Sequence, residues 1–109
     1  MSIFSEVIAA DPNNKKIKPL VFKTDAHFMM DKMLEFLSDN NFRVELVSRE
    51  YQEIYAVDNY REYTFTFISD GSSTSLRIVL FTRYNKLTKK KYLLQTIDKI
   101  KESFKEYLQ

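Results

Sequence analysis

The stretch with the clearest chemical character is the basic segment RYNKLTKKKY at residues 83–92, which has five positive charges and no acid. The charges belong to Arg83, Lys86, Lys89, Lys90 and Lys91. Thr88 is a favourable N-cap, so the three consecutive lysines are expected in the first turn of a helix. Free backbone N–H groups at that end of a helix attract anions, and the lysines would strengthen the attraction. The segment therefore predicts an anion-binding corner at its four lysines. The alternative is a solvated lysine run in a loop, with the helix beginning only at Tyr92.

Side chains suited to catalysis or metal binding are few and isolated. His27, the only histidine, precedes Asp31 by four residues, which would place both on one helix face, but the further ligands of a metal site are not indicated. A single glycine cannot form a glycine-rich phosphate loop, and a chain without cysteine has neither a thiolate nucleophile nor a disulfide. The serines and the carboxylate pairs lie on predicted turns and exposed strand ends, away from any base. We therefore expect a protein that is not an enzyme and uses no metal or cofactor.

The composition is that of one small domain in a reducing compartment. A chain of 109 residues can bury a core without metals or cross-links, and the absence of cysteine allows the cytoplasm, which is the expected location. The apolar cluster near the N-terminus has no basic start and is interrupted by Ser5 and Glu6, so neither a signal peptide nor a membrane span is expected. The net charge of +2 is the sum of +2 over residues 1–24, −5 over residues 25–62 and +5 over residues 63–109. This asymmetry favours oppositely charged surfaces on one molecule.

Turn-forming residues and hydrophobic periodicity divide the chain into an arm and a domain. We expect residues 1–16, which end in DPNNKK, to form a flexible N-terminal arm, and residues 17–109 to form a single α+β domain. Apolar residues at three-to-four spacing predict one helix that begins near Asp25 and a second helix after Thr88. The run IKPLVFK before the first helix is β-prone, and Pro19 confines it to a sheet edge.

Four further strands are predicted between residues 42 and 82, and their alternation assigns side chains to faces. The inward set is Phe42, Val44, Leu46, Ile54, Ala56, Tyr63, Phe65, Phe67, Leu76, Ile78 and Leu80. Alternation leaves residues 51–57 open to either face, and a two-residue turn at Asp58-Asn59, which would pair Ile54 with Tyr63, puts Ile54 and Ala56 inward. A loop at residues 70–73 would pair Phe67 with Leu76. The predicted fold is a single antiparallel sheet of four to five strands with two helices packed on one face, in the order β-α-β-β-β-β-α.

The sheet face without helices carries more aromatic and apolar residues than solvation requires. We predict a protein interface there, formed by Arg43, Tyr51, Tyr55, Val57, Tyr60, Arg77, Val79, Phe81 and Arg83. Tyr and Arg are favoured at interfaces because they combine contact area with a polar end. The alternatives are ordinary strand composition, cover by the N-terminal arm, and a stacking surface for nucleic-acid bases. Glu45, Glu53 and Glu62 on the same face would repel phosphates.

Together these patterns favour a non-catalytic protein-interaction module that dimerises, or docks a protein partner, through the helix-free sheet face. The alternative function is binding of nucleic acid or another polyanion at the basic corner, residues 83–91. In this arrangement Arg83 belongs with the sheet face, and Lys89, Lys90 and Lys91 belong with the second helix. No membrane partner is expected.

Overall fold

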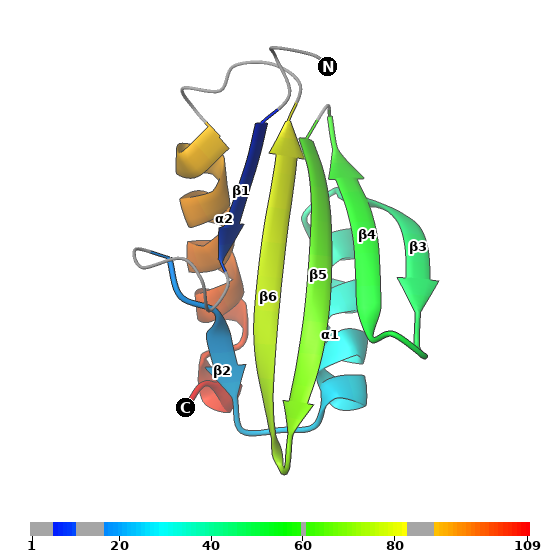
Figure 1. The fold of residues 1–109 in the computed structure, drawn as a ribbon, viewed down its shortest axis with the longest axis vertical. Coiled ribbons are helices and arrows are strands. Elements are labelled where there is room, and N and C mark those ends of the chain that lie inside the picture. The colour runs from blue at the N-terminus through cyan, green and yellow to red at the C-terminus, as the bar shows by residue number, and fades with distance from the viewer. Residues whose placement is uncertain (1–5, 11–16, 60, 83–88) are drawn as a thin grey trace.

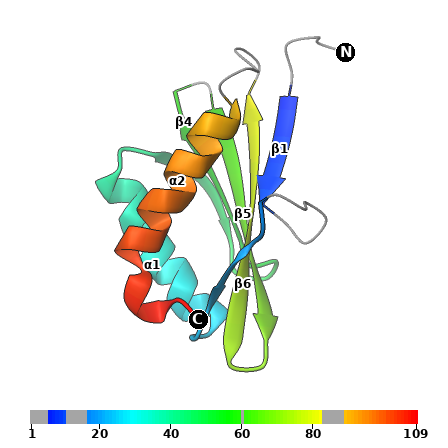
Figure 2. The same ribbon diagram turned by 90° about the vertical axis from the view of Figure 1, so that its left-hand side faces the viewer.

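Two α-helices, a short 3-10 helix and a six-stranded antiparallel sheet form the described part of the chain. The structure is a computed structural model that describes residues 6–10, 17–59, 61–82 and 89–109. The elements are β1 (Glu6–Ala10), β2 (Leu20–Phe22), α1 (Ala26–Asp39), β3 (Arg43–Ser48), β4 (Glu53–Asp58), β5 (Arg61–Asp70), β6 (Ser73–Thr82), α2 (Lys89–Ser103) and the short 3-10 helix η1 (Lys105–Tyr107). Both α1 and α2 lie on one side of the sheet, and the other side is free of described helices (Figure 1, Figure 2). The predicted α+β class and the order β-α-β-β-β-β-α are confirmed, with β1 added before them.

Strands β1 and β2 lie one after the other along one edge of the sheet (Figure 1). β1 pairs with residues 78–82 of β6, and β2 pairs with residues 74–76. Across the sheet the order is β1-β6-β5-β4-β3, so the six strands form a sheet that is five strands wide. β2 alone is too short to satisfy the backbone groups along β6, and β1 pairs with the remainder. Of the expected N-terminal arm, Glu6–Ala10 therefore belongs to the sheet, and residues 1–5 and 11–16 lie outside the described residues.

Helix α1 begins and ends where its residues predict. The carboxylate of Asp25 accepts a hydrogen bond of 2.9 Å from the backbone N–H of Phe28 and so caps the helix. Beyond the other end, Asn41 has a left-handed backbone with φ 64°, which asparagine tolerates better than most residues. The fully buried side chains between these ends include Met29, Met30, Met33 and Leu37. The methionine stripe therefore fills the core beneath the sheet.

Helix α2 packs against the same face and adds a polar contact to the core. Its buried apolar side chains are Leu93, Ile97 and Ile100, followed by Phe104 just beyond the helix. The hydroxyl of Tyr63 lies 3.0 Å from the hydroxyl of Thr96 on α2, and both side chains are buried. Burial raises the pKa of the Tyr63 phenol above its ordinary value. The phenol is therefore a neutral hydrogen-bonding partner that joins the helix to the sheet.

The hairpin between β5 and β6 has the predicted register. Phe67 pairs with Leu76, and the pairing continues to Asp70 opposite Ser73. Gly71, in the turn, has φ 64°, a conformation that favours glycine. The inward apolar residues of both strands are buried, as their alternation predicts.

The hairpin between β4 and β5 is displaced from its predicted register. Ile54 pairs with Phe65, two positions beyond the predicted partner, because Asp58 pairs with Arg61 and the turn begins one residue later. Asn59 has a positive φ of 57°, as tight hairpin turns require. A shift by two residues preserves side-chain parity, so the inward residues of β4 remain buried.

Strand β3 contains a bulge that moves two residues to unexpected faces. After Val44 the pairing with β4 slips by one position, and Glu45 has no partner in the register. Such a bulge reverses the alternation of the residues that follow it. Leu46 therefore lies on the helix-free face beside Tyr55, where it is 62% exposed, while Val47 lies on the helix-covered face. The prediction that Leu46 is a core residue is wrong.

Candidate protein interface on the helix-free sheet face

Strand pairing arranges the helix-free face in rows that cross the sheet. One row is formed by Arg43, Val57, Glu62 and Phe81, and the next by Leu46, Tyr55, Thr64 and Val79. A third row consists of Ser48, Glu53, Thr66 and Arg77. Apolar side chains are concentrated in the first two rows, which we call the apolar rows. These rows cross the half of the sheet nearest the C-terminal end of β6 (Figure 1).

The apolar rows are accessible to solvent. Leu46 is 62% exposed, and Tyr55, Val57, Val79 and Phe81 are half-buried by their neighbours on the sheet. Most exposed apolar side chains on a protein are scattered singly and need no explanation. A connected set with a polar row beside it is instead typical of a surface that another protein covers.

Each of the three glutamates on this face accepts a hydrogen bond from a neighbouring side chain. The donors are Arg43 to Glu45 at 3.3 Å, Thr66 to Glu53 at 3.2 Å, and Tyr55 to Glu62. Hydrogen bonds to a carboxylate are stronger than those between neutral groups. Carboxylates that are already hydrogen-bonded cost less free energy to cover than carboxylates without partners. The face is therefore better prepared for burial under a protein than its charges alone indicate.

The structure places most of the predicted interface residues on this one face. They are Arg43, Tyr55, Val57, Arg77, Val79 and Phe81. Tyr51 lies in the turn between β3 and β4, away from the apolar rows, and is 70% exposed. Tyr60 and Arg83 lie outside the described residues. Leu46 was missed because simple alternation assigns it to the core, and no glycine or proline in β3 signals the bulge.

The basic corner is described only in its second half. Helix α2 begins at Lys89, so Lys89, Lys90 and Lys91 form its first turn, as predicted. The side chains of Lys90 and Lys91 are exposed. Lys86, like Arg83, lies outside the described residues. The N-terminus of α2 therefore carries lysines, although the partial positive charge of the helix dipole at that end repels cations.

Arg61, at the start of β5, joins the β4–β5 turn to helix α2. Its guanidinium donates a hydrogen bond of 2.8 Å to the carboxylate of Asp58 and lies 3.8 Å from the ring centre of Tyr92. Burial alone would lower the pKa of Arg61, but the hydrogen bond and the charge of Asp58 outweigh it and raise the pKa. The sequence did not predict this contact because Arg61 and Tyr92 are far apart along the chain.

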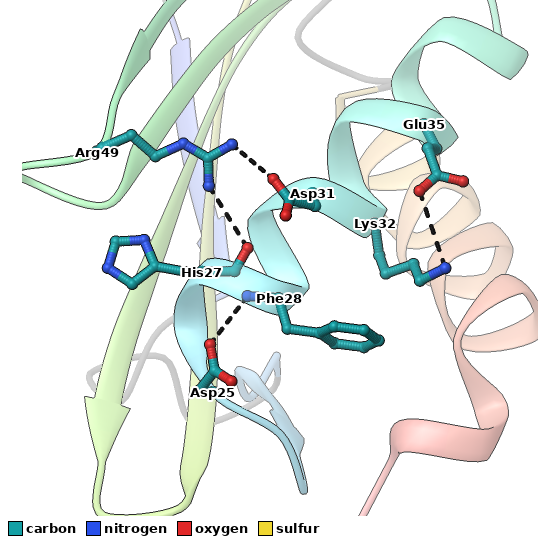
Figure 3. Close-up of polar contacts among 7 residues, drawn as sticks. All are labelled: Asp25, His27, Phe28, Asp31, Lys32, Glu35 and Arg49. Carbon is teal, nitrogen blue, oxygen red and sulfur yellow. Dashed lines mark hydrogen bonds and ion pairs between the residues drawn. The ribbon is translucent and has the colours of Figure 1, made fainter.

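The carboxylate of Asp31, four residues after His27, is paired with Arg49. Arg49, in the turn after β3, donates a hydrogen bond of 2.6 Å to the Asp31 carboxylate and makes a longer contact of 3.5 Å with the backbone carbonyl of His27 (Figure 3). The imidazole points away from Asp31 (Figure 3). Among the described residues, no group of three or more His, Cys, Asp or Glu side chains could hold a metal ion. The cluster instead ties the β3–β4 turn to the start of α1.

A cleft of about 280 Å³ lies on the helix side of the molecule, between α1 and the residues around η1. Its lining consists of Lys32, Glu35, Phe36, Asp39, Asn40, Ser103, Phe104, Glu106 and Tyr107. Lys32 lies 3.8 Å from the Glu35 carboxylate and 5.5 Å from the ring centre of Phe28 (Figure 3). None of the residues predicted for function borders this cleft.

Comparisons with known proteins give no match to a protein family, a curated protein or a solved structure. Within the residues that the structure describes, no helix is long and apolar enough to cross a membrane. A functional conclusion must therefore rest on the chemistry and geometry of the chain itself.

Proposed function

We propose that this protein is a non-catalytic interaction module, in the cytoplasm, that docks a protein partner or a second copy through its helix-free sheet face. The observation that carries the proposal is the pair of apolar rows, which lie side by side across four strands and in which Leu46 is exposed and the other apolar side chains are half-buried. Tyr55, Val79 and Phe81 would supply most of the contact energy, because large side chains near the middle of an interface dominate binding. Arg43 and Arg77, at the rim, would set the orientation of the partner.

The charges of the face favour a protein over a nucleic acid. Single-stranded nucleic acids do stack their bases on aromatic side chains of a sheet, but such surfaces also attract the phosphate backbone with basic residues. Here Glu45, Glu53 and Glu62 lie on the same face as Arg43 and Arg77. The acids outnumber the bases among these residues, so the local field opposes a polyanion.

The double substitution Tyr55→Glu with Val79→Glu tests the proposed docking face. It introduces two carboxylates into the centre of the apolar rows, and we expect self-association or partner binding to be lost while the chain stays folded, because neither side chain is in the core. Sedimentation velocity measures self-association, pull-down measures partner binding, and circular dichroism reports the fold. Leu94→Glu is a suitable control, because Leu94 is 40% exposed on α2, away from this face. A wild-type chain that sediments as a monomer and retains no partner would contradict the proposal.

A second candidate function is polyanion binding at the start of α2. The observation that favours it is the position of Lys89, Lys90 and Lys91 in the first helical turn, where cations reduce helix stability but strengthen the attraction of the helix end for an anion. A charge cluster at this end of a helix would hold a phosphate-bearing ligand by electrostatics, without base recognition.

Replacing Lys89, Lys90 and Lys91 together with glutamate tests this second candidate. If the lysines contact about three phosphates of single-stranded DNA, raising the salt from 50 to 200 mM should weaken wild-type binding roughly ten- to twentyfold, and the triple variant should not bind. Fluorescence anisotropy with a labelled mixed-sequence oligonucleotide measures both effects. Glutamate at Lys99, Lys101 and Lys105 is the matched control, because it makes the same change in net charge beyond the first turn of α2. Binding that is absent, insensitive to salt or equally reduced in the control would exclude the site.

A further inference from the structure

Strand β3 forms the free edge of the sheet. In the described part of the chain it pairs with β4 on one side and with no strand on the other (Figure 1). None of its six residues is buried. Leu46 and Val47 are 62% and 38% exposed and, as adjacent residues of a strand, lie on opposite faces. A strand that is unpaired on one side is a template for another strand, and the bulge and the charged side chains of β3 restrict which strands can pair with it.

The charges of β3 are complementary to those of a second β3 that runs antiparallel to it. Arg43 and Glu45 flank Val44 and lie on the same face, where they form an ion pair of 3.3 Å within the chain. If Val44 lies opposite its own copy, each Arg43 lies opposite the Glu45 of the other chain. A register centred on Glu45 would instead place the two Glu45 carboxylates opposite each other. Opposite charges across an antiparallel pair stabilise it, and like charges destabilise it.

We propose that β3 pairs antiparallel with β3 of a second copy, with Val44 facing Val44, so that the two sheets become one continuous sheet. The two-fold axis passes through the Val44 pair, so the contact is isologous. Both chains use the same short segment of β3. The four charges of Arg43 and Glu45 then alternate in sign around the axis on the helix-free face. This contact goes beyond the docking surface proposed above, because it uses the edge and, although it shares Arg43 with the apolar rows, leaves their apolar side chains uncovered.

The bulge limits the length of this contact and therefore its strength. Regular pairing along the edge extends only as far as Glu45, because the backbone changes direction there. A ladder this short buries less than the ~1,200 Å² of stable complexes, so the dimer belongs with transient associations. It should form reversibly as the protein concentration rises. The resulting sheet would present two sets of apolar rows on one surface.

Two single charge reversals, studied separately and mixed, test the edge contact. Arg43→Glu gives a chain with acids at both positions, and Glu45→Arg gives a chain with bases at both. Each variant alone should dimerise about tenfold or more weakly than wild type, because every cross-strand pair becomes a like-charge pair. An equimolar mixture should form a heterodimer, because each pair across the two chains then has opposite charges. Sedimentation equilibrium measures the affinities, and a fluorescent label on one variant identifies the heterodimer.

The mixture separates a contact between chains from an effect within one chain. Both reversals break the ion pair between Arg43 and Glu45 in their own chain, and mixing cannot restore it. Both side chains are substantially exposed, so the variants should keep the wild-type melting temperature within a few degrees. A monomeric wild type, single variants that dimerise like wild type, or a mixture without heterodimer would each overturn the proposal. Dimerisation that resists both reversals but is lost in Tyr55→Glu with Val79→Glu would assign it to the sheet face instead.

Discussion

Replacing Phe65 with alanine should lower the free energy of unfolding by about 3–5 kcal/mol. Phe65 is fully buried at the middle of β5, where it pairs with Ile54 on one side and Ile78 on the other. Its ring stacks on the ring of Tyr63 with the centroids 5.7 Å apart. Alanine would remove this apolar surface from the core and leave a cavity that two rigidly paired neighbouring strands cannot close. Urea denaturation followed by circular dichroism measures the loss.

Ile68→Ala is the matched control for this substitution. Ile68 lies on the same strand, but its side chain is on the helix-free face and 45% exposed. Its replacement removes less buried surface, so the free energy of unfolding should fall by no more than about 1 kcal/mol. Equal losses for the two substitutions would contradict the assignment of the core to the helix-covered face.

Alternation alone assigned Phe65 to the core, and the structure confirms that Phe65 is buried. The side-chain period of a strand is two, so a single buried face identifies every second residue once a strand is recognised. The error in the β4–β5 register did not affect this assignment, because a shift by two positions leaves each side chain on its original face. Sequence therefore predicted the faces of β4, β5 and β6 better than it predicted the turn between β4 and β5.

The bulge in β3 could not be predicted in the same way. Glu45 interrupts the alternation of a segment, RVELVS, that reads as a regular strand with Val44 and Leu46 inward. A bulge depends on how the whole strand twists against its neighbour, and here no glycine marks its position. The bulge also changes the candidate interface, because it places Leu46 in the apolar rows.

The role of β1 was also hidden in the sequence. The expectation for residues 1–16 followed from the turn formers at 11–16, which do separate Glu6–Ala10 from β2. β1 pairs with the part of β6 that β2 leaves unpaired. A strand this short is stabilised by its pairing partner more than by its own composition. Local composition cannot report the length of an edge that lies some seventy residues further along the chain.

Nothing in the sequence signalled the contact between Arg61 and Tyr92. Replacing Arg61 with alanine should lower the free energy of unfolding by about 2–4 kcal/mol, because it leaves the Asp58 carboxylate without its ion-pair partner and removes the cation from the Tyr92 ring. The Arg61 side chain is only 11% exposed and the Asp58 side chain 30% exposed, so water replaces the lost contacts incompletely. The loss should be measured by urea denaturation at neutral pH.

Arg43→Ala is the matched control for Arg61→Ala, since both remove one arginine from an ion pair on the same sheet. The Arg43 side chain is 71% exposed, and pairs of this kind contribute little to stability, so the expected loss is at most about 1 kcal/mol. The measurement is made at a protein concentration where the chain is monomeric, so that no contact of the β3 edge contributes.

Arg61 also contacts Tyr92 in the first turn of α2, next to the exposed Lys90 and Lys91. Amide exchange in that turn should therefore accelerate in Arg61→Ala and remain unchanged in Arg43→Ala, whereas similar losses and similar exchange would show that Arg61 does not anchor α2.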